Sequence, residues 1–463
     1  MPLDKDADGA PGPPRTGGLS AGRRLLAALG VVLVVAGCAF LRLPRQSHPS
    51  LAPAYSARYE VDGLPVVGAA QVTPASRLVV RFLKPVRAAS VQLTLDGRPL
   101  PESALAWAAD GTSVGVSLDA LPPYQPVELR ATGDRKLRNP GPLRLTLAAA
   151  QPVNSASGVG PGFRPRTPVE IVVENSGPAR PQAGLQGADV VFEYLSEYSI
   201  TRMTAVYFAA IPALVGPVRS CRMINPYLTY AYTGFTMCSG VSDGTAGWMF
   251  GAVPGSRPVP NLMDAFDRNG HYFRSGARAA PHNLYTSGDR ASSLRRDAPQ
   301  PPGDYAVDPP HDDVPAGQPA PAPTVPLHAI AYQYDPASRQ YLRFDHGTPF
   351  TDQDTGGQLQ AKTVVLMHVP FHDGGWVEDE SGGGAHSVWY DMLGSGPAEV
   401  YSDGLLVQAT WHMGTAGQSY GDNHQPVWFT DAAGHLLRLN TGLTWVHVLG
   451  VGQEQCPESP TCR

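Results

Sequence analysis

Three groups of side chains between residues 175 and 285 are equipped for chemistry. The first is a pair of carboxylates, Glu193 and Glu197, whose spacing puts both on one face of a strand or of a helix. Paired carboxylates carry out glycoside hydrolysis, in which one acts as acid and the other as base or nucleophile. The alternative is structural charge, in which one carboxylate pairs with Arg202 or Arg219.

The second group is the segment 216–222, Gly-Pro-Val-Arg-Ser-Cys-Arg. Gly-Pro makes a turn and Ser220 can cap a helix, which would place Arg219 and Arg222 in the first helical turn. Free N–H groups, the helix dipole and two guanidinium groups together form an anion site. The alternative is that both arginines pair inside the fold with nearby carboxylates, namely Asp189, Glu193 or Asp243.

The third group, in the segment 281–285, is the imidazole of His282, the amide of Asn283 and the phenol of Tyr285. A histidine titrates near neutral pH, so His282 could serve as a general base, whereas a hydrogen-bonded structural histidine is the alternative. The polar loop 239–245, Ser-Gly-Val-Ser-Asp-Gly-Thr, could line the same cleft.

We predict that these residues converge on one cleft, because a charge left buried without a partner is costly. Arg219, Arg222 and His282 are expected to line it with Glu193, Asp243 and Asn283. The predicted catalytic residues are Glu193, Glu197 and His282, and the predicted ligand-binding residues are Arg202, Arg219, Arg222, Asp243, Asn283 and Tyr285.

Several classes of protein are disfavoured by the rest of the sequence. No P-loop, HExxH or GxGxxG motif occurs, which argues against NTPases, thermolysin-type proteases and Rossmann enzymes. No CxxC motif or His/Cys cluster is present, so neither a metal nor a cofactor is predicted. The net charge is -5 and no basic stripe stands out, so we expect no nucleic-acid partner.

The N-terminus predicts export. Arg23 and Arg24 precede an apolar run from 25 to 41, which is the pattern of a bacterial signal sequence. The run contains Val-Ala-Gly-Cys38, which resembles the lipobox of bacterial lipoproteins, where the cysteine receives diacylglycerol. One alternative is an uncleaved signal anchor, although the run is at the short limit of a membrane span. The other alternative is a protein that is released from the membrane. All three place the folded domains outside the cytoplasm.

The cysteine count agrees with an oxidising compartment. Of five cysteines, lipidation of Cys38 leaves four. An even number permits two disulfides, predicted as Cys456 with Cys462 and Cys221 with Cys238. A nucleophilic Cys221–His282 pair is the alternative for Cys221.

The fold class is predicted to be multidomain, β-rich α+β. With 50 Gly and 47 Pro, the composition indicates many turns and short strands rather than a helical bundle. Two extended regions alternate with the strand period and contain turn signals such as Asp96-Gly97 and Asp403-Gly404. The expected order is signal or anchor 1–41, tether 42–54, β-sandwich 55–150, mixed α/β domain 151–297, Pro-rich linker 298–326, β-rich domain 327–450 and Cys-containing tail 451–463.

Two resemblances accompany this division. Residues 55–150 resemble the bacterial Ig-like domains of surface proteins, through Val-Thr-Pro-Ala-Ser at 72–76 and Asp-Gly-Thr at 110–112. Residues 151–450 resemble the YerB-like bacterial lipoproteins, a family of unknown function (3048) with N- and C-terminal domains. The matching stretches are residues 180–193, 200–202, 216–222, 280–285, 334–335, 355–362, 394–401, 429–434 and 442–445.

The YerB-like resemblance implies an extracytoplasmic lipoprotein and carries over no settled activity. We therefore expect a lipid-anchored envelope protein that binds an anionic cell-wall or surface polymer. A glycan-cleaving enzyme and a scaffold for another envelope protein are the alternatives. The C-terminal domain contains five tryptophans, Trp376, Trp389, Trp411, Trp428 and Trp445. Exposed indoles could form a sugar-binding surface, and the alternative is that these side chains pack in the core.

Overall fold

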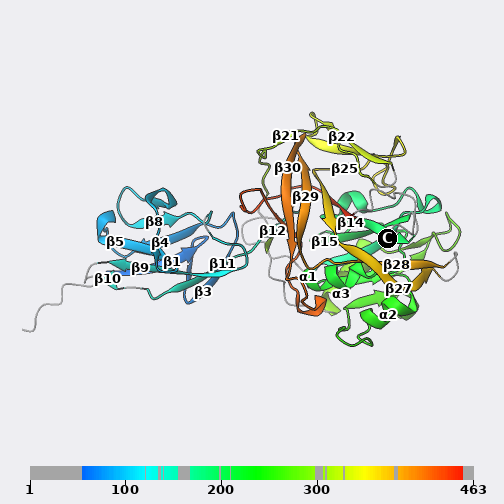
Figure 1. Cartoon of the computed structure of the whole chain (residues 1–463), viewed down its shortest axis with the longest axis horizontal. Coiled ribbons are helices and arrows are strands. Elements are labelled where there is room, and N and C mark those ends of the chain that lie inside the picture. Colours follow the sequence, from blue (N-terminus) through cyan, green and yellow to red (C-terminus); the bar gives the residue numbers. More distant parts are fainter. Residues whose placement is uncertain are drawn as a thin grey trace, which may run out of the picture. The chain divides into compact units, whose positions relative to one another are not determined.

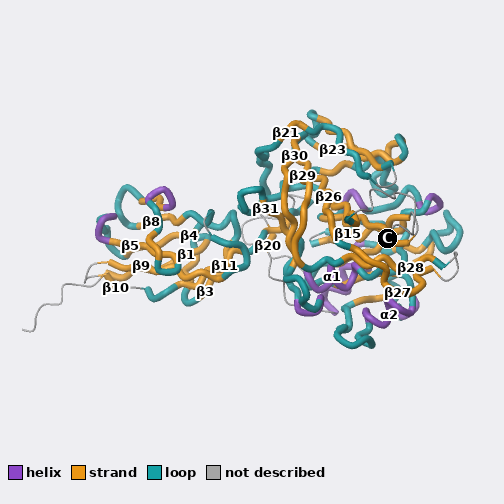
Figure 2. Tube along the Cα trace, viewed as in Figure 1, coloured by secondary structure: helices purple, strands orange, loops and turns teal. Residues whose placement is uncertain are grey.

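The computed structural model describes residues 55–451 except 120, 134–136, 139, 155–166, 198–199, 209, 298–305, 308–309, 327–328 and 380–383. Strands dominate this part of the chain and helices are few and short (Figure 2). This confirms the predicted β-rich α+β class. None of the described helices has the length and apolar composition that a membrane span needs.

Residues 55–147 form two sheets that pack around one apolar core. The first sheet has the order β10 (Leu137–Arg138), β1 (Tyr55–Val61), β4 (Leu78–Phe82), β8 (Ser113–Val116) and β7 (Leu105–Trp107), with β2 (Leu64–Val66) beside β1. The second has the order β3 (Ala69–Val72), β11 (Leu143–Leu147), β9 (Pro126–Gly133), β5 (Val91–Leu95) and β6 (Arg98–Pro99). A sandwich is therefore present, and its kinship with Ig-like domains stays a prediction.

The two sheets of the sandwich share apolar and polar contacts. Leu78 and Val80 of the first sheet are buried with Leu129 and Leu145 of the second. Between the sheets, the Tyr59 hydroxyl accepts a hydrogen bond from the backbone N–H of Ala131 at 3.0 Å. The alternating buried and exposed positions of β9 are what one solvated face and one core face require.

Residues 169–450 are organised by an 11-stranded sheet (Figure 1). Its order is β17 (Asn261–Met263), β16 (Phe235–Cys238), β13 (Val169–Glu174), β15 (Ile200–Tyr207), β14 (Val190–Glu197), β32 (Thr444–Gly450), β26 (Thr363–Val369), β29 (Gly394–Ser402), β30 (Leu405–Met413) and β21 (Gln318–Pro319), with β31 (Trp428–Thr430) beside β30. The parallel pairing of β14 with β32 joins the two regions that the sequence divided at the linker.

Apolar cores cover both faces of this sheet. All six residues of β13, Val-Glu-Ile-Val-Val-Glu, are buried, with Val172 in one core and Ile171 and Val173 in the other. A run rich in β-branched residues is typical of a strand that is covered on both sides. The strand consequently carries its acidic side chains into the interior, where each needs a partner.

Short helices and smaller sheets complete this region. The helices are α1 (Ile224–Ala231), α2 (Asp243–Met249) and α3 (Gly288–Asp297). The smaller sheets contain β22 (Ile330–Asp335), β23 (Gln340–Asp345), β24 (Thr348–Pro349) and β25 (Gln360–Ala361); the hairpin β27 (Phe371–Asp379) and β28 (Ala385–Tyr390); β18 (Phe273–Arg274) and β19 (Leu284–Tyr285); and β12 (Ala150–Gln151) and β20 (Ala306–Val307).

Three local expectations have clear outcomes. The turn Asp403-Gly404 is confirmed, since both residues have positive φ and join β29 to β30. The residue types of 261–267 favour a short helix, and this expectation is wrong, because Asn261–Met263 pair with β16 and only a 3-10 turn follows. Part of the predicted linker lies in the sheet, because Pro319 is tolerated in an edge strand such as β21.

Candidate functional site

A cavity of about 620 Å³ brings together most of the predicted site residues. Its walls come from the ends of β13, β14 and β15, from the loops before α1 and α2, and from the hairpin strand β27. The lining residues are Glu174, Ser176, Glu197, Ile200, Arg202, Arg219, Ser220, Arg222, Gly240, Val241, Ser242, Asp243, His282 and Glu378. Six predicted site residues therefore line one cavity although they are spread along the sequence: Glu197, Arg202, Arg219, Arg222, Asp243 and His282.

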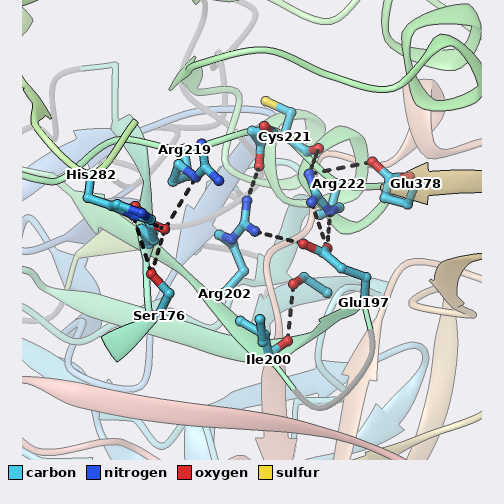
Figure 3. A network of polar contacts seen from close by, with 12 residues as sticks. Ser176, Glu197, Ile200, Arg202, Arg219, Cys221, Arg222, His282 and Glu378 are labelled. Carbon is cyan, nitrogen blue, oxygen red and sulfur yellow. Dashed lines mark hydrogen bonds and ion pairs between the residues drawn. The ribbon is translucent and has the colours of Figure 1, made fainter. Parts of the chain in front are cut away.

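The first cluster in the cavity wall is a buried ion-pair network around Glu197 (Figure 3). Arg222 donates to Glu197 Oε2 from Nε at 2.8 Å and from Nη2 at 2.6 Å. Arg202 donates to the other oxygen, Oε1, at 3.1 Å. Both oxygens of Glu197 are therefore occupied by guanidinium groups.

Electrostatics keeps Glu197 ionised. Burial alone would raise the pKa of Glu197, but the charges of Arg202 and Arg222 outweigh burial and hold the pKa below its ordinary value. A general acid needs the opposite shift, because it must keep its proton at working pH. The surroundings of Glu197 therefore favour a structural carboxylate rather than a proton donor.

Glu378 adds a second carboxylate to this network from the distant strand β27. Its side chain is fully buried, and Oε1 lies 3.4 Å from Arg222 Nη1. Oε2 accepts hydrogen bonds from Thr245 Oγ1 and from Trp376 Nε1, each at 3.0 Å. Arg222 is therefore held between Glu197 and Glu378, and the C-terminal half of the chain contributes to the cavity.

The second cluster is centred on one oxygen of Glu174. Oε1 accepts a hydrogen bond from Ser176 Oγ at 2.7 Å and lies 2.9 Å from His282 Nδ1. Arg219 Nε lies 3.4 Å from the same oxygen. Figure 3 shows His282, Ser176 and Arg219 gathered on the side of the network away from Glu378.

Arg219 and Arg222 differ in how much of each guanidinium group is used. The side chain of Arg222 is 7% exposed and all three of its nitrogens have partners. The side chain of Arg219 is 29% exposed, and no described residue accepts a hydrogen bond from its two terminal nitrogens. His282 is similar, since its Nε2 atom has no hydrogen-bond partner among the described residues. Arg219 and His282 therefore each offer nitrogen atoms that no described residue binds.

The loop that carries the arginines is extended rather than helical. The N–H of Arg219 donates to Val172 O at 2.9 Å, and Val218 bridges to Val173 of β13. This pairing delays the helix until Ile224, so the predicted cap at Ser220 is wrong and no helix N-terminus backs the arginines. An anion bound here is held by side chains rather than by a helix N-terminus.

A disulfide between Cys221 and Cys238 fastens this loop, as predicted. Both cysteines are fully buried. The N–H of Cys221 donates to Gly240 O at 3.1 Å, and the N–H of Ser239 donates to Arg219 O at 2.9 Å. The bridge excludes Cys221 as a nucleophile paired with His282.

Glu193 lies outside the cavity, contrary to the predicted shared face with Glu197. The pairing of β14 with β15 changes register between Leu195 and Glu197, and this irregularity turns Glu197 toward the other side of the sheet. Glu193 is instead buried against Arg343, 2.7 Å away, and accepts a hydrogen bond from Trp445 Nε1 at 2.9 Å. The structure therefore offers no Glu193–Glu197 carboxylate pair.

Asn283 and Tyr285 also do not line the cavity. The Asn283 amide donates to the carbonyls of Ser275 and Arg278, each at 3.1 Å. The Tyr285 hydroxyl accepts a hydrogen bond from Arg278 at 2.6 Å. Both side chains hold the loop that positions His282. Cys38, Cys456 and Cys462 lie outside the described residues.

Sequence reasoning missed Glu174, Ser176 and Glu378 as lining residues. Glu174 ends a predicted buried strand, and an acidic residue at that position was a usable signal. Glu378 had no such signal, because only the packing of β27 against α2 brings it to Arg222.

The loop before α2 also has the Gly-x-Ser-x-Gly pattern of a nucleophile elbow, at residues 240–244, which the prediction overlooked. A strand and a helix do flank it, but an elbow serine has strained backbone angles. Ser242 has extended φ and ψ angles of -68° and 159°, and its Oγ accepts the N–H of Thr245 as a helix cap. No hydrogen bond joins Ser242 to His282 among the described residues, so Ser242 is a capping residue.

Comparison with known proteins identifies the family. Residues 157–300 match the family model described as protein of unknown function (DUF3048), N-terminal domain, and residues 324–446 match the model of the corresponding C-terminal domain. Together the two matches cover more than half of the chain. The chain belongs to the YerB-like family. It is 26% identical over 258 residues to YerB of Bacillus subtilis (strain 168), a protein whose name describes it as a candidate lipoprotein, with 53% of this chain and 73% of YerB covered.

A solved structure belongs to the same YerB-like family. The crystal structure of the Bacillus subtilis YerB protein matches with a TM-score of 0.49 and 23% sequence identity, covering 62% of this chain and 91% of the other. The sandwich at 55–150 precedes both matched family domains in the sequence.

Proposed function

We propose that this chain is a lipid-anchored envelope protein whose cavity binds one anionic group of a cell-wall or surface polymer. The lipid anchor is supported by the lipobox-like sequence ending at Cys38 and by the candidate lipoprotein relative. The anion is supported by one observation, the unused terminal nitrogens of Arg219 at the cavity wall. A guanidinium fork with two free nitrogens matches the oxygens of a carboxylate or a phosphodiester.

The charge balance of the cavity limits what the ligand can be. Three arginines face four carboxylates, so the cavity is not a positively charged basin. Glu197, Glu378 and Glu174 already accept hydrogen bonds, so we expect Arg219 and His282 to contact the anion, whereas Asp243 can accept hydrogen bonds from hydroxyl groups. Recognition then depends on directional hydrogen bonds to one monoanionic group rather than on attraction of a polyanion.

The test compares two neighbouring arginines. Arg219→Gln should weaken binding to purified wall fragments and leave the melting temperature unchanged. A hydrogen bond to a charged group contributes about 1.5–3 kcal/mol, which corresponds to roughly tenfold to a hundredfold in Kd. Arg222→Gln should instead lower the melting temperature, because it leaves two buried carboxylates without their shared partner.

Arg144 provides the control, since it is an exposed arginine of the sandwich remote in sequence from the cavity residues. Arg144→Gln should change neither property. Wild-type binding in the Arg219→Gln variant would refute the anion site. Absence of binding to any wall fragment, together with saturable binding to a single envelope protein, would favour the scaffold function.

Hydrolysis in the same cavity is a second candidate because of the Glu174–His282 contact. A proton on Nδ1 would be held by the Glu174 carboxylate, which leaves the lone pair of Nε2 available as a base. Mass spectrometry of wall fragments after incubation would detect new products. Products formed by the wild type and not by His282→Gln would support this activity, whereas unchanged fragments would leave a binding protein.

A further inference from the structure

The hairpin of β27 and β28 carries aromatic side chains next to Glu378, a residue that lines the cavity. Trp376 and Glu378 are two positions apart on β27, and their side chains are joined by the hydrogen bond from the indole Nε1 to Glu378 Oε2. Glu378 lines the cavity and contacts Arg222. The Trp376 ring is therefore attached directly to the cavity wall.

The indole of Trp376 lies against the first turn of α2. A Cβ atom on Gly244 would come within 2.2 Å of the ring, so only glycine permits this contact. Gly244 follows Asp243, an exposed cavity-lining residue. Trp376 itself is partly exposed and belongs to neither core of the large sheet. The ring is thus held in place beside the cavity without being part of the core.

More aromatic rings continue from Trp376 along the hairpin. Trp389 packs edge-on against Trp376 at 6.0 Å and against Trp248 at 4.8 Å. The imidazole of His372 stacks on Trp389 at 5.4 Å with an interplanar angle of 22°. His372 and Asp391 are each 51% exposed and lie 3.5 Å apart. The hairpin therefore presents rings together with polar groups that can bind hydroxyls.

Only some of the tryptophans are available for such a surface. Trp411 and Trp445 are buried in the two cores of the large sheet. Trp376 and Trp389 are partly exposed. Trp428 is also partly exposed but lies on β31, stacked on His412, so among these tryptophans the two on the hairpin are the ones next to the cavity.

We infer that the ligand is a glycan, with a sugar ring on Trp376 and a carboxylate or phosphodiester attached to that sugar in contact with Arg219. This inference rests on the anion-binding function proposed above. A sugar ring has an apolar C–H face that stacks on an indole and hydroxyl groups at its edge that need hydrogen-bond partners. Asp243 beside Trp376, and His372 with Asp391 farther along the hairpin, supply such partners. A lipid or an unglycosylated polyphosphate would use the arginine and leave the rings unused.

The experiment measures dissociation constants of the full chain by NMR titration with four probes. Two probes carry a sugar and an anion: a disaccharide containing N-acetylmuramic acid, and a glycerol-phosphate oligomer substituted with N-acetylglucosamine. The other two are anions without a sugar ring: lactate, and the unsubstituted glycerol-phosphate oligomer. Whichever sugar-bearing probe binds more tightly identifies the carboxylate or the phosphodiester as the natural group.

Trp376→Ala should weaken binding of the preferred sugar-bearing probe about tenfold, the scale of removing one stacking ring. Binding of the matching sugar-free anion should not change. Trp376→Phe keeps an aromatic face and should retain most of the affinity. It also lacks the indole N–H, so it reports whether the loss in Trp376→Ala comes from the ring or from the freed Glu378 carboxylate. Melting temperatures of both variants verify the fold.

The two proposals fail in different ways. Unchanged affinity of Trp376→Ala for the sugar-bearing probe, with a loss in Arg219→Gln, would overturn the glycan inference and keep the anion site. Equal weakening of the sugar-bearing and sugar-free probes by Trp376→Ala would also overturn it. Unchanged binding of every probe by Arg219→Gln would refute the proposed function itself.

Discussion

Glu170 shows what a buried carboxylic acid does at the scale of one residue. It is completely inaccessible in β13, where Oε2 accepts hydrogen bonds from Thr229 and Thr236, each at 2.9 Å, while Oε1 has no hydrogen-bond partner among the described residues. Burial raises the pKa of Glu170 to about 7, although the two hydroxyl groups act against this shift. The carboxyl group is therefore most stable in its neutral form.

The raised pKa predicts a pH-dependent stability. The neutral form contributes its full stabilisation below the ordinary pKa of 4.5, and this contribution is lost as the pH rises through about 7. The upper limit of the loss is about 3 kcal/mol, from the free-energy equivalent of the pKa shift. Glu170→Gln should raise the melting temperature at pH 8 and change it little at pH 5. Equal effects at both values would show that Glu170 does not change its protonation state between pH 5 and pH 8.

Glu193 shows the opposite balance at the same scale. Burial alone would raise its pKa, but the charge of Arg343 and further partners outweigh burial and lower the pKa to about 2. Nearby, burial lowers the pKa of His447 to about 3, so its imidazole is neutral at physiological pH. The Glu193–Arg343 pair is 1% exposed on each side and joins β14 to β23. Its role is to hold two layers together, which explains why a predicted catalytic residue lies away from the cavity.

At the scale of elements, one disulfide holds together two of the loops that line the cavity. Cys221 and Cys238 close a loop with a sequence separation of 17. Cys221 lies between Arg219 and Arg222 in the loop 216–222. Cys238 comes directly before the loop that leads into α2. The position of Arg219 relative to Asp243 therefore depends on this bridge.

Replacing both cysteines by serine tests that dependence. The double variant Cys221→Ser, Cys238→Ser should lose about 3 kcal/mol of folding free energy, as loop-closure entropy predicts for this separation. It should also bind the anionic probes more weakly under conditions where it is fully folded, because Arg219 loses its fixed position. Urea unfolding and NMR titration give the two quantities. Weaker folding with unchanged affinity would show that the backbone hydrogen bonds alone position the arginine.

At the scale of the whole molecule, the two YerB-like domains share one sheet. β32 from the C-terminal match lies between β14 of the N-terminal match and β26. The hairpin β27–β28 adds Glu378 to the cavity, and Arg343 pairs with Glu193 across the same division. Neither half has the complete cavity without the other.

This sharing predicts that a cut chain stays together. A specific protease site inserted between residues 301 and 304 should be cleaved without separating the products. The two fragments should elute as one species in size-exclusion chromatography, because the β14–β32 pairing and the buried ion pair persist. They should separate in urea. Separation in native buffer would show that the halves are independent domains.

Local patterns in the sequence were enough to predict many of the strands, the turn at Asp403-Gly404 and the class of fold. Alternation of apolar residues in β9 and the Asp-Gly pair at 403–404 are local signals, because side-chain direction and positive φ depend on neighbouring residues only. The pairing of Cys221 with Cys238 was also predicted, because the even count and the short loop between Cys456 and Cys462 leave these two cysteines for each other. The stretches that resemble the YerB-like family were also recognised from residues close together in the chain.

Which charged residues face the cavity depends on contacts between segments that are distant in the sequence. One irregularity between Leu195 and Glu197 puts Glu193 and Glu197 on different faces, although their spacing predicts a common one. Glu378 contacts Arg222, which makes that arginine structural. Arg219 contacts only Glu174 among the described carboxylates, and its terminal nitrogens stay free. These outcomes depend on contacts between distant segments, and the types of residue in a segment do not state which partner will neutralise a buried charge.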